Sequence, residues 1–218
     1  MRRVHKGPEP ASLKTYREED QTRSWDDYTG KEDARKAATT EQRQLCAFCQ
    51  VSIQYRAKPI KLAHVVPQKG SEDGFRLQLI WSNIVGACRG GDNTNRPQIH
   101  HCDTLQGNRR LLPTLDPVQF VNGTLTFDWD GKILSPNKDE QKQLDEYLGL
   151  NCKPVIRGRL QALEKIEELL KSLETLEERE AERQRLLHLL DPGQHSEEYL
   201  YEYADFIFFH LREGRLSA

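Results

Sequence analysis

The sequence lacks any long apolar run. Its most apolar stretch near the end, Phe206 to Phe209, is far shorter than the roughly 20 residues that a membrane-spanning helix needs. The start, Met1-Arg2-Arg3, leads into polar residues where a secretory signal would carry an apolar segment. Only 36% of the residues are hydrophobic and 30% are charged, which favours a large exposed helical part. We therefore expect a cytoplasmic protein that does not enter a membrane.

The chain also lacks a net charge large enough to indicate its partner, since the formal value is −2. The distribution of charge is more informative. Between Cys46 and Leu112 nine basic residues face four acidic ones, whereas between Leu160 and Leu190 eight acidic residues face five basic ones. A basic segment of this kind is expected to meet phosphate, and the acidic helix is not.

Cysteine is scarce, yet four of the five cysteines fall within one segment. Cys46 and Cys49 form a CxxC pair, and Cys88 and Cys102 follow without forming a second one. Thiols stay reduced in the cytoplasm, so this set is typical of a metal site before it is typical of disulfides. Zn²⁺ takes four tetrahedral ligands, and the four cysteines predict a structural zinc site. The alternative is a coincidental CxxC with two buried free thiols, and Cys152 is expected to be an ordinary core thiol.

The pattern of residues predicts an α+β fold whose regular elements are short in the middle of the chain and long at its end. Residues 1 to 40 are charged and weakly periodic, and Pro8 and Pro10 predict an extended start. Hydrophobic periodicity and turn signals then predict helices at 31–43, 135–148, 159–190 and 196–212, strands at 51–60 and 61–66, and a small meander at 120–134. Ser135 is expected to cap the helix that starts there, and the last two helices are expected to form an αα-hairpin.

His64 is a candidate catalytic residue, although a lone histidine on a strand is more often a satisfied core residue. It lies between two apolar pairs just before Pro67, with Asn83 and Asp103 further along the chain. Hydrolysis of a phosphodiester needs a base that activates water and a cation that stabilises the developing charge. A neutral imidazole and a carboxylate ligand meet those two needs.

These residues resemble the HNH endonucleases. The resemblance is carried by Cys46-x-x-Cys49, Ala63-His64-Val65-Val66-Pro67, Asn83-Ile84-Val85 and Cys88…Cys102-Asp103…Gly107-Asn108. Three further motifs are similar to retron-associated and Septu-type (PtuB-like) HNH proteins of anti-phage defence: Lys6-Gly-Pro-Glu-Pro10, Trp81-x-Asn83 and His101-Cys102-Asp103. The resemblance covers about residues 1 to 160.

The resemblance implies a ββα-metal core in which His64 is the general base and Asn83 braces the loop between the two strands. Asp103 would be a ligand of a catalytic divalent cation, Mg²⁺, Mn²⁺ or Zn²⁺, and the four cysteines would hold the structural zinc. Ala63 departs from the family, because the residue before the base usually helps to bind the cation. Gln106 stands where the family often has lysine.

Two basic residues could compensate for the missing lysine. Arg109 and Arg110 are candidate phosphate contacts, and the alternative is that they form a solvated helix end.

The resemblance divides the chain into four regions and implies a partner. The regions are an N-terminal extension at 1–45, the HNH nuclease core at 46–112, a meander and helix packing on the core at 113–158, and a helical hairpin at 159–218. Septu-type HNH proteins pair with an ATPase subunit, which implies the hairpin as its docking element. The other interpretation of the hairpin is that it packs its own apolar faces together.

The function expected on these grounds is a metal-dependent endonuclease that hydrolyses DNA as the effector of an ATPase-containing defence system. Two alternatives remain open. One is an RNA nuclease, for example of tRNA, with the same site. The other is a catalytically inactive zinc-ribbon module for nucleic-acid binding or assembly, which Ala63 would favour.

Overall fold

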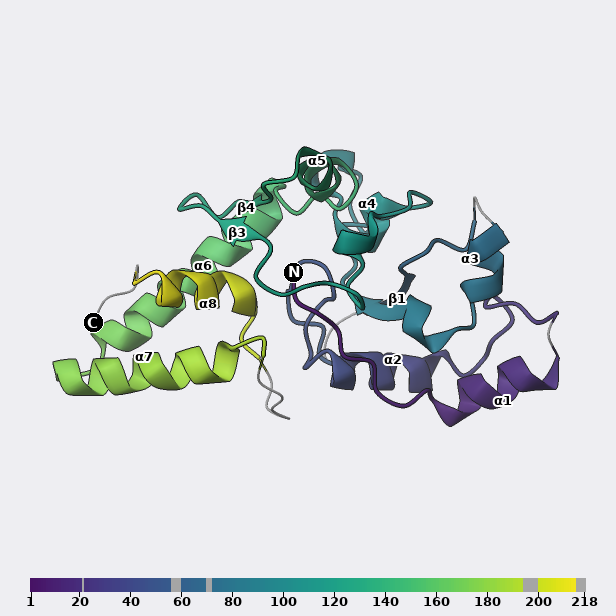
Figure 1. Cartoon of the computed structure of the whole chain (residues 1–218), viewed down its shortest axis with the longest axis horizontal. Helices are drawn as coiled ribbons and strands as arrows, with labels where there is room; N and C mark the ends of the chain where they lie inside the picture. The colour runs from purple at the N-terminus through teal and green to yellow at the C-terminus, as the bar shows by residue number, and fades with distance from the viewer. Residues whose placement is uncertain (21, 56–59, 70–71, 194–199, 215–218) are drawn as a thin grey trace.

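The middle of the chain forms a β-hairpin followed by a short helix. In the computed structural model, which describes all residues except 21, 56–59, 70–71, 194–199 and 215–218, β1 (Lys61–His64) pairs antiparallel with β2 (Ile84–Ala87). His64 lies opposite Ile84 in this register. The helix α4 (Cys102–Gln106) follows, and Figure 1 shows it beside the hairpin.

The hairpin separates two buried clusters, because side chains alternate between the faces of a strand. Ala63 and Val85 face a large cluster that includes the cysteines. Leu62 and Ile84 belong to the other face, which packs on a smaller cluster formed by the N-terminal helices and their connection. His64 pairs with Ile84 and therefore shares this second face.

Two N-terminal helices cover that second face. They are α1 (Ala11–Glu19) and α2 (Lys31–Glu41), and α2 contacts both strands of the hairpin. The extended start expected around Pro8 and Pro10 ends where α1 begins. The helix α1 was not predicted, because its residues are mostly exposed and bury only Leu13, so that it carries little hydrophobic periodicity. The loop between β1 and β2 contains α3 (Glu72–Leu77) and a turn of 3-10 helix, η1 (Trp81–Asn83).

The segment after α4 contains a second, smaller hairpin. Two further single turns of 3-10 helix lie on either side of α4. The elements are η2 (Pro97–Ile99), η3 (Pro113–Leu115), β3 (Thr126–Phe127), β4 (Ile133–Leu134) and α5 (Lys138–Glu146). The expected meander carries two turn signals, Asn122-Gly123 and Asp130-Gly131. Asp130-Gly131 lies between the paired strands, as predicted, whereas Asn122-Gly123 precedes β3 and joins no strand pair among the described residues. The side chain of Asn122 accepts the backbone N–H of Arg3 at 2.8 Å.

The cap of α5 also differs from the expectation. Asn137, and not Ser135, caps the helix by accepting the backbone N–H groups of Asp139 and Glu140. The hydroxyl of Ser135 donates instead to the carboxylate of Glu140 at 2.6 Å.

The described residues of the C-terminal end form three helices where two were expected, because the helix expected over residues 159–190 is divided in two. They are α6 (Lys153–Lys171), α7 (Leu176–Leu190) and α8 (Ala204–Arg212). The break follows Lys171, and Thr175 begins α7 with a capping box to Glu178. The hairpin is therefore formed by α6 and α7, and α8 packs against both of them. Residues 194–199 of the expected last helix lie outside the described residues.

The expected strand at 51–60 was also wrong in its described part, where a single isolated bridge joins Leu45 to Ser52. Residues 56–59 of that expected strand are outside the described residues.

The C-terminal helices are attached to the cysteine segment. The backbone carbonyl of Gln50 accepts the N–H of Tyr203 at 2.9 Å, and its side-chain oxygen accepts the N–H of Asp205 at 3.0 Å. Arg2 pairs with the carboxylate of Asp205 at 2.7 Å. One buried cluster extends through all these elements from Met1 to Leu211. Among the described residues, no helix combines the length and the apolar character needed to cross a membrane.

Candidate metal centre and active site

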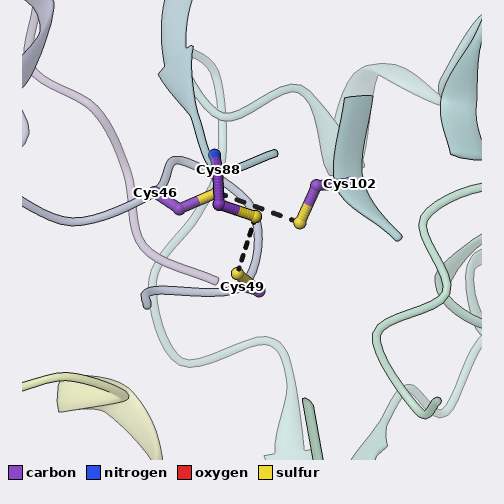
Figure 2. A group of neighbouring side chains, drawn as sticks. All are labelled: Cys46, Cys49, Cys88 and Cys102. Carbon is purple, nitrogen blue, oxygen red and sulfur yellow. Dashed lines mark hydrogen bonds between the residues drawn. The ribbon is translucent and has the colours of Figure 1, made fainter. Parts of the chain in front are cut away.

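Four cysteine thiols point toward one another and form the candidate metal centre (Figure 2). All four sulfur atoms lie within 4.8 Å of each other. The Sγ atoms of Cys46 and Cys102 are 3.8 Å apart, and those of Cys49 and Cys88 are 3.7 Å apart. A tetrahedral zinc ion with Zn–S bonds of about 2.3 Å places its sulfur ligands about 3.8 Å apart. The donor set therefore fits a tetrahedral metal ion such as zinc, as predicted from the CxxC pair.

Backbone contacts bring the two distant cysteines to the CxxC turn. The N–H of Cys88 donates to the Sγ of Cys46 at 3.3 Å. Gly90 then turns with a φ of +55°, and its carbonyl accepts the N–H of His101 at 3.0 Å. A Cβ at Gly90 would collide with the carbonyl oxygen of His101, so only glycine allows this close approach. The approach places Cys102 beside the knuckle, although no second CxxC exists.

The thiols of the cluster titrate differently, since hydrogen bonds from Cys102 and Cys46 lower the pKa of the Cys88 thiol. Burial raises the pKa of the Cys102 thiol well above its usual value. A bound divalent cation reverses this preference, because it is ligated by the deprotonated form. Cys152 lies outside the cluster and is half-buried.

His64 ends β1 with its ring orientation fixed by one hydrogen bond. Its Nε2 lies 2.9 Å from the backbone carbonyl of Gln78, which can only accept, so Nε2 carries the proton. The lone pair of the neutral ring is then on Nδ1. Burial lowers the pKa of His64, which favours the neutral imidazole at pH 7. The tautomer of His64 is thus set by the loop between the strands.

Trp25 covers His64 from the N-terminal extension. The two rings meet edge to face with centroids 5.0 Å apart, and His64 is 8% exposed. The backbone N–H of Trp25 donates to the side-chain oxygen of Gln78 at 3.0 Å, so both residues are held by Gln78. Sequence reasoning did not identify Trp25 or Gln78 as part of the site. Neither belongs to a recognisable motif, and Gln78 acts on His64 through a backbone carbonyl that every residue possesses.

Asn83 ties the loop between the strands together. Its side-chain oxygen accepts the N–H of Val66 at 2.7 Å, and its amide donates to the carbonyls of Val66 at 3.1 Å and Leu77 at 3.2 Å. Asn83 is buried, so these bonds satisfy its amide fully. They fix the chain on both sides of the segment that carries Gln78.

Asp103 lies near the start of β1, away from His64. Its carboxylate is 3.8 Å from the ammonium of Lys61, which also approaches Asp92 at 3.1 Å. Burial raises the pKa of the Asp103 carboxyl. Lys61 and His64 are three residues apart on one strand and point to opposite faces, which separates them by about 10 Å. The structure therefore does not bring His64 and Asp103 together.

A second metal site is not formed around His64 in the described part of the chain. There, the four cysteines are the only group of three or more histidine, cysteine and acidic side chains close enough to share an ion. Ala63 is buried in the core and supplies no ligand. The role of Asp103 as a ligand of a catalytic cation stays a prediction.

The two candidate phosphate contacts differ in how they are engaged. Arg109 donates to the backbone carbonyls of Leu105, Gln106 and Glu146, so its guanidinium joins the ends of two helices. Arg110 is 62% exposed in its side chain and pairs with Asp73 at 3.0 Å. Of the two, Arg110 is the one whose guanidinium is open to solvent.

The hairpin, the histidine at the end of its first strand, the following short helix and the cysteine cluster agree with an HNH-like fold. The fold therefore agrees with the HNH class of nucleases that the sequence motifs resemble.

A comparison with known proteins agrees with that class. The chain is 26% identical over 148 residues to the "Retron Ec83 putative HNH endonuclease" of Escherichia coli. The match covers 62% of this chain and 54% of that protein, so the chain spans about half the length of the curated relative. The chain is therefore related to a retron-associated HNH endonuclease, which supports a nuclease. No family model matches it.

Proposed function

We propose that this protein is an HNH-type endonuclease that hydrolyses phosphodiester bonds in DNA, with His64 as general base. The observation that carries the proposal is the hydrogen bond from Nε2 of His64 to the carbonyl of Gln78 at 2.9 Å. This bond leaves the Nδ1 lone pair to take a proton from water. The relationship to a retron-associated HNH endonuclease supports the same chemistry.

The reaction is proposed to need a divalent cation, which would stabilise charge on the phosphate. The described residues do not form a set of ligands for this cation around His64. Asp103 is proposed as one of its ligands. The hydrogen bonds of the chain assign a role to two further residues. Gln78 orients the base, and Asn83 holds the loop that presents Gln78.

The first test compares substrates. Purified protein is incubated with plasmid DNA and with tRNA, with and without added Mg²⁺ or Mn²⁺, and products are resolved on gels. We expect the plasmid to be cut only when the ion is added, and the tRNA to stay intact. Cleavage of tRNA alone would replace DNA by RNA as the substrate. Binding without cleavage would favour the inactive zinc-ribbon module, the alternative that Ala63 motivates.

The pH dependence offers an independent check of the base. Burial lowers the pKa of His64 below its usual 6.5, and the neutral form is the one that accepts a proton. The rate at low substrate concentration should therefore be constant above pH 6.5 and fall as the pH drops through a value below 6.5. Initial rates across pH would measure this. A half-maximal rate above pH 6.5 would contradict it.

The partner is proposed to be an ATPase subunit of a Septu-type defence complex that docks on the C-terminal helices. Two aromatic residues of this part of the chain, Tyr203 and Phe206, are buried within the protein. Leu176 and Tyr201, which also belong to the C-terminal part of the chain, are exposed and could contact a partner. Substitution at Leu176 tests the docking better than removal of residues 159–218, which would also remove part of the core.

A further inference from the structure

An aromatic side chain stands exposed in the loop that holds the candidate base. Phe75, in α3, is 60% exposed, although burial of a phenylalanine side chain stabilises a fold. It lines a cavity of about 430 Å³ between α1 and the loop. An exposed aromatic ring in a concave surface offers a flat apolar face to a ligand.

The same cavity is lined by three arginine residues, Arg17, Arg23 and Arg76. Two acidic residues, Glu18 and Asp20, line it as well.

The arginines differ in how their charge is compensated. Arg17 pairs with Glu9 at 2.7 Å and Arg23 with Glu19 at 2.6 Å. Within the part of the chain that the structure describes, Arg76 forms no ion pair, and it is adjacent to Phe75. The ring and an uncompensated positive charge are thus neighbours on one wall.

The cavity is joined to the candidate active site by Gln78, which lines it as well. The carbonyl of Gln78 accepts the Nε2–H of His64, and its side chain accepts the N–H of Trp25. An occupant of the cavity therefore lies against the residue that orients the base.

We propose that this cavity takes an unpaired nucleotide of the substrate strand, with its base stacked on Phe75 and its phosphate facing Arg76. The inference rests on the proposed nuclease function and assigns a substrate preference to the same site. Bases stack on aromatic side chains irrespective of sequence, and arginine adds a charge-dependent contact to the backbone. A base inside a duplex has no free face, so the site favours single-stranded or locally opened nucleic acid.

The test measures binding and does not depend on cleavage. In a His64→Ala background, a fluorescently labelled single strand and the corresponding duplex are titrated with protein and followed by anisotropy. We expect Phe75→Ala to weaken binding of the single strand by about 5- to 150-fold and to leave duplex binding nearly unchanged. Phe75→Trp should retain binding, whereas Phe75→Leu, which is apolar but not aromatic, should lose it.

Two further variants complete the design. Trp129, in the turn between β3 and β4, is 58% exposed and does not line the cavity. Trp129→Ala is therefore the matched control and should bind as the parent does. Arg76→Gln should reduce the dependence of binding on salt. Thermal melting establishes that each variant is folded.

Equal binding by Phe75→Ala and Trp129→Ala would overturn the proposal, as would equal losses on single strand and duplex. Binding that depends on Phe75 in a protein that cleaves neither DNA nor RNA would keep the nucleotide site and reject the nuclease. Cleavage by the wild type that does not depend on Phe75 would keep the nuclease and reject the nucleotide site.

Discussion

Replacement of Cys49 by serine is expected to release the bound metal and unfold the cysteine core. The thiol of Cys49 lies 3.7 Å from that of Cys88 and is one of four sulfur atoms placed at tetrahedral spacing. Binding of a structural zinc contributes on the order of 10 kcal/mol to folding, which is comparable to the whole stability of a domain. Elemental analysis should find one zinc per chain in the wild type and almost none in the variant. Circular dichroism should show loss of the cooperative thermal transition.

Cys152→Ser is the control for this experiment. Cys152 is half-buried and lies outside the cluster, so the variant should keep both its metal and its thermal transition. Wild-type protein without metal, or a folded Cys49→Ser variant that still binds it, would instead support the reading of the cysteines as buried free thiols.

Replacement of His64 by alanine is expected to lower the cleavage rate by about 10²- to 10⁴-fold, the usual contribution of a general base. The loss should appear in kcat, with little change in nucleic-acid binding. His64→Asn is a second variant that fills more of the space beside Trp25 and retains an N–H donor for Gln78, yet has no basic nitrogen. Rates are measured under single-turnover conditions so that product release does not obscure the chemical step.

The matched control is His188→Ala, since His188 is an exposed histidine on α7, one of the C-terminal helices. It should cleave at the wild-type rate. If His64→Ala and His64→Asn also cleave at that rate while remaining folded, His64 is not the base.

The cysteine cluster could be predicted from the sequence because its chemistry is strict. Four thiols in a reducing environment have few uses other than metal binding, and a CxxC turn already fixes half of the ligand geometry. The contact that joins Cys88 to Cys102 could not be derived, because it depends on Gly90 and on a backbone hydrogen bond to His101. Spacing alone does not show where an irregular loop closes.

The helical end shows the limit of periodicity. Leu170, Leu173 and Leu176 continue one stripe at three-residue steps, so the pattern predicts a single helix through them. The chain breaks after Lys171 because Thr175 and Glu178 form a capping box, a local signal that competes with the stripe.

The surroundings of His64 were the least predictable part of the site. The resemblance places His64, Asn83 and Asp103 in one constellation, but residue types do not show distances. In the structure Asp103 faces Lys61, and the space over His64 is taken by Trp25 from a segment far away in the sequence. The register of a strand decides which face a side chain occupies, and the packing of the extension decides what covers it.

Gln50 connects the cysteine cluster to the last helix of the chain. It directly follows Cys49 in a left-handed conformation, with a φ of +66°, and the two backbone amides it holds belong to the start of α8. The shape of the cysteine turn therefore sets where the last helix begins. Protection of the Tyr203 and Asp205 amides from hydrogen exchange should therefore report metal occupancy at residues that are not themselves ligands.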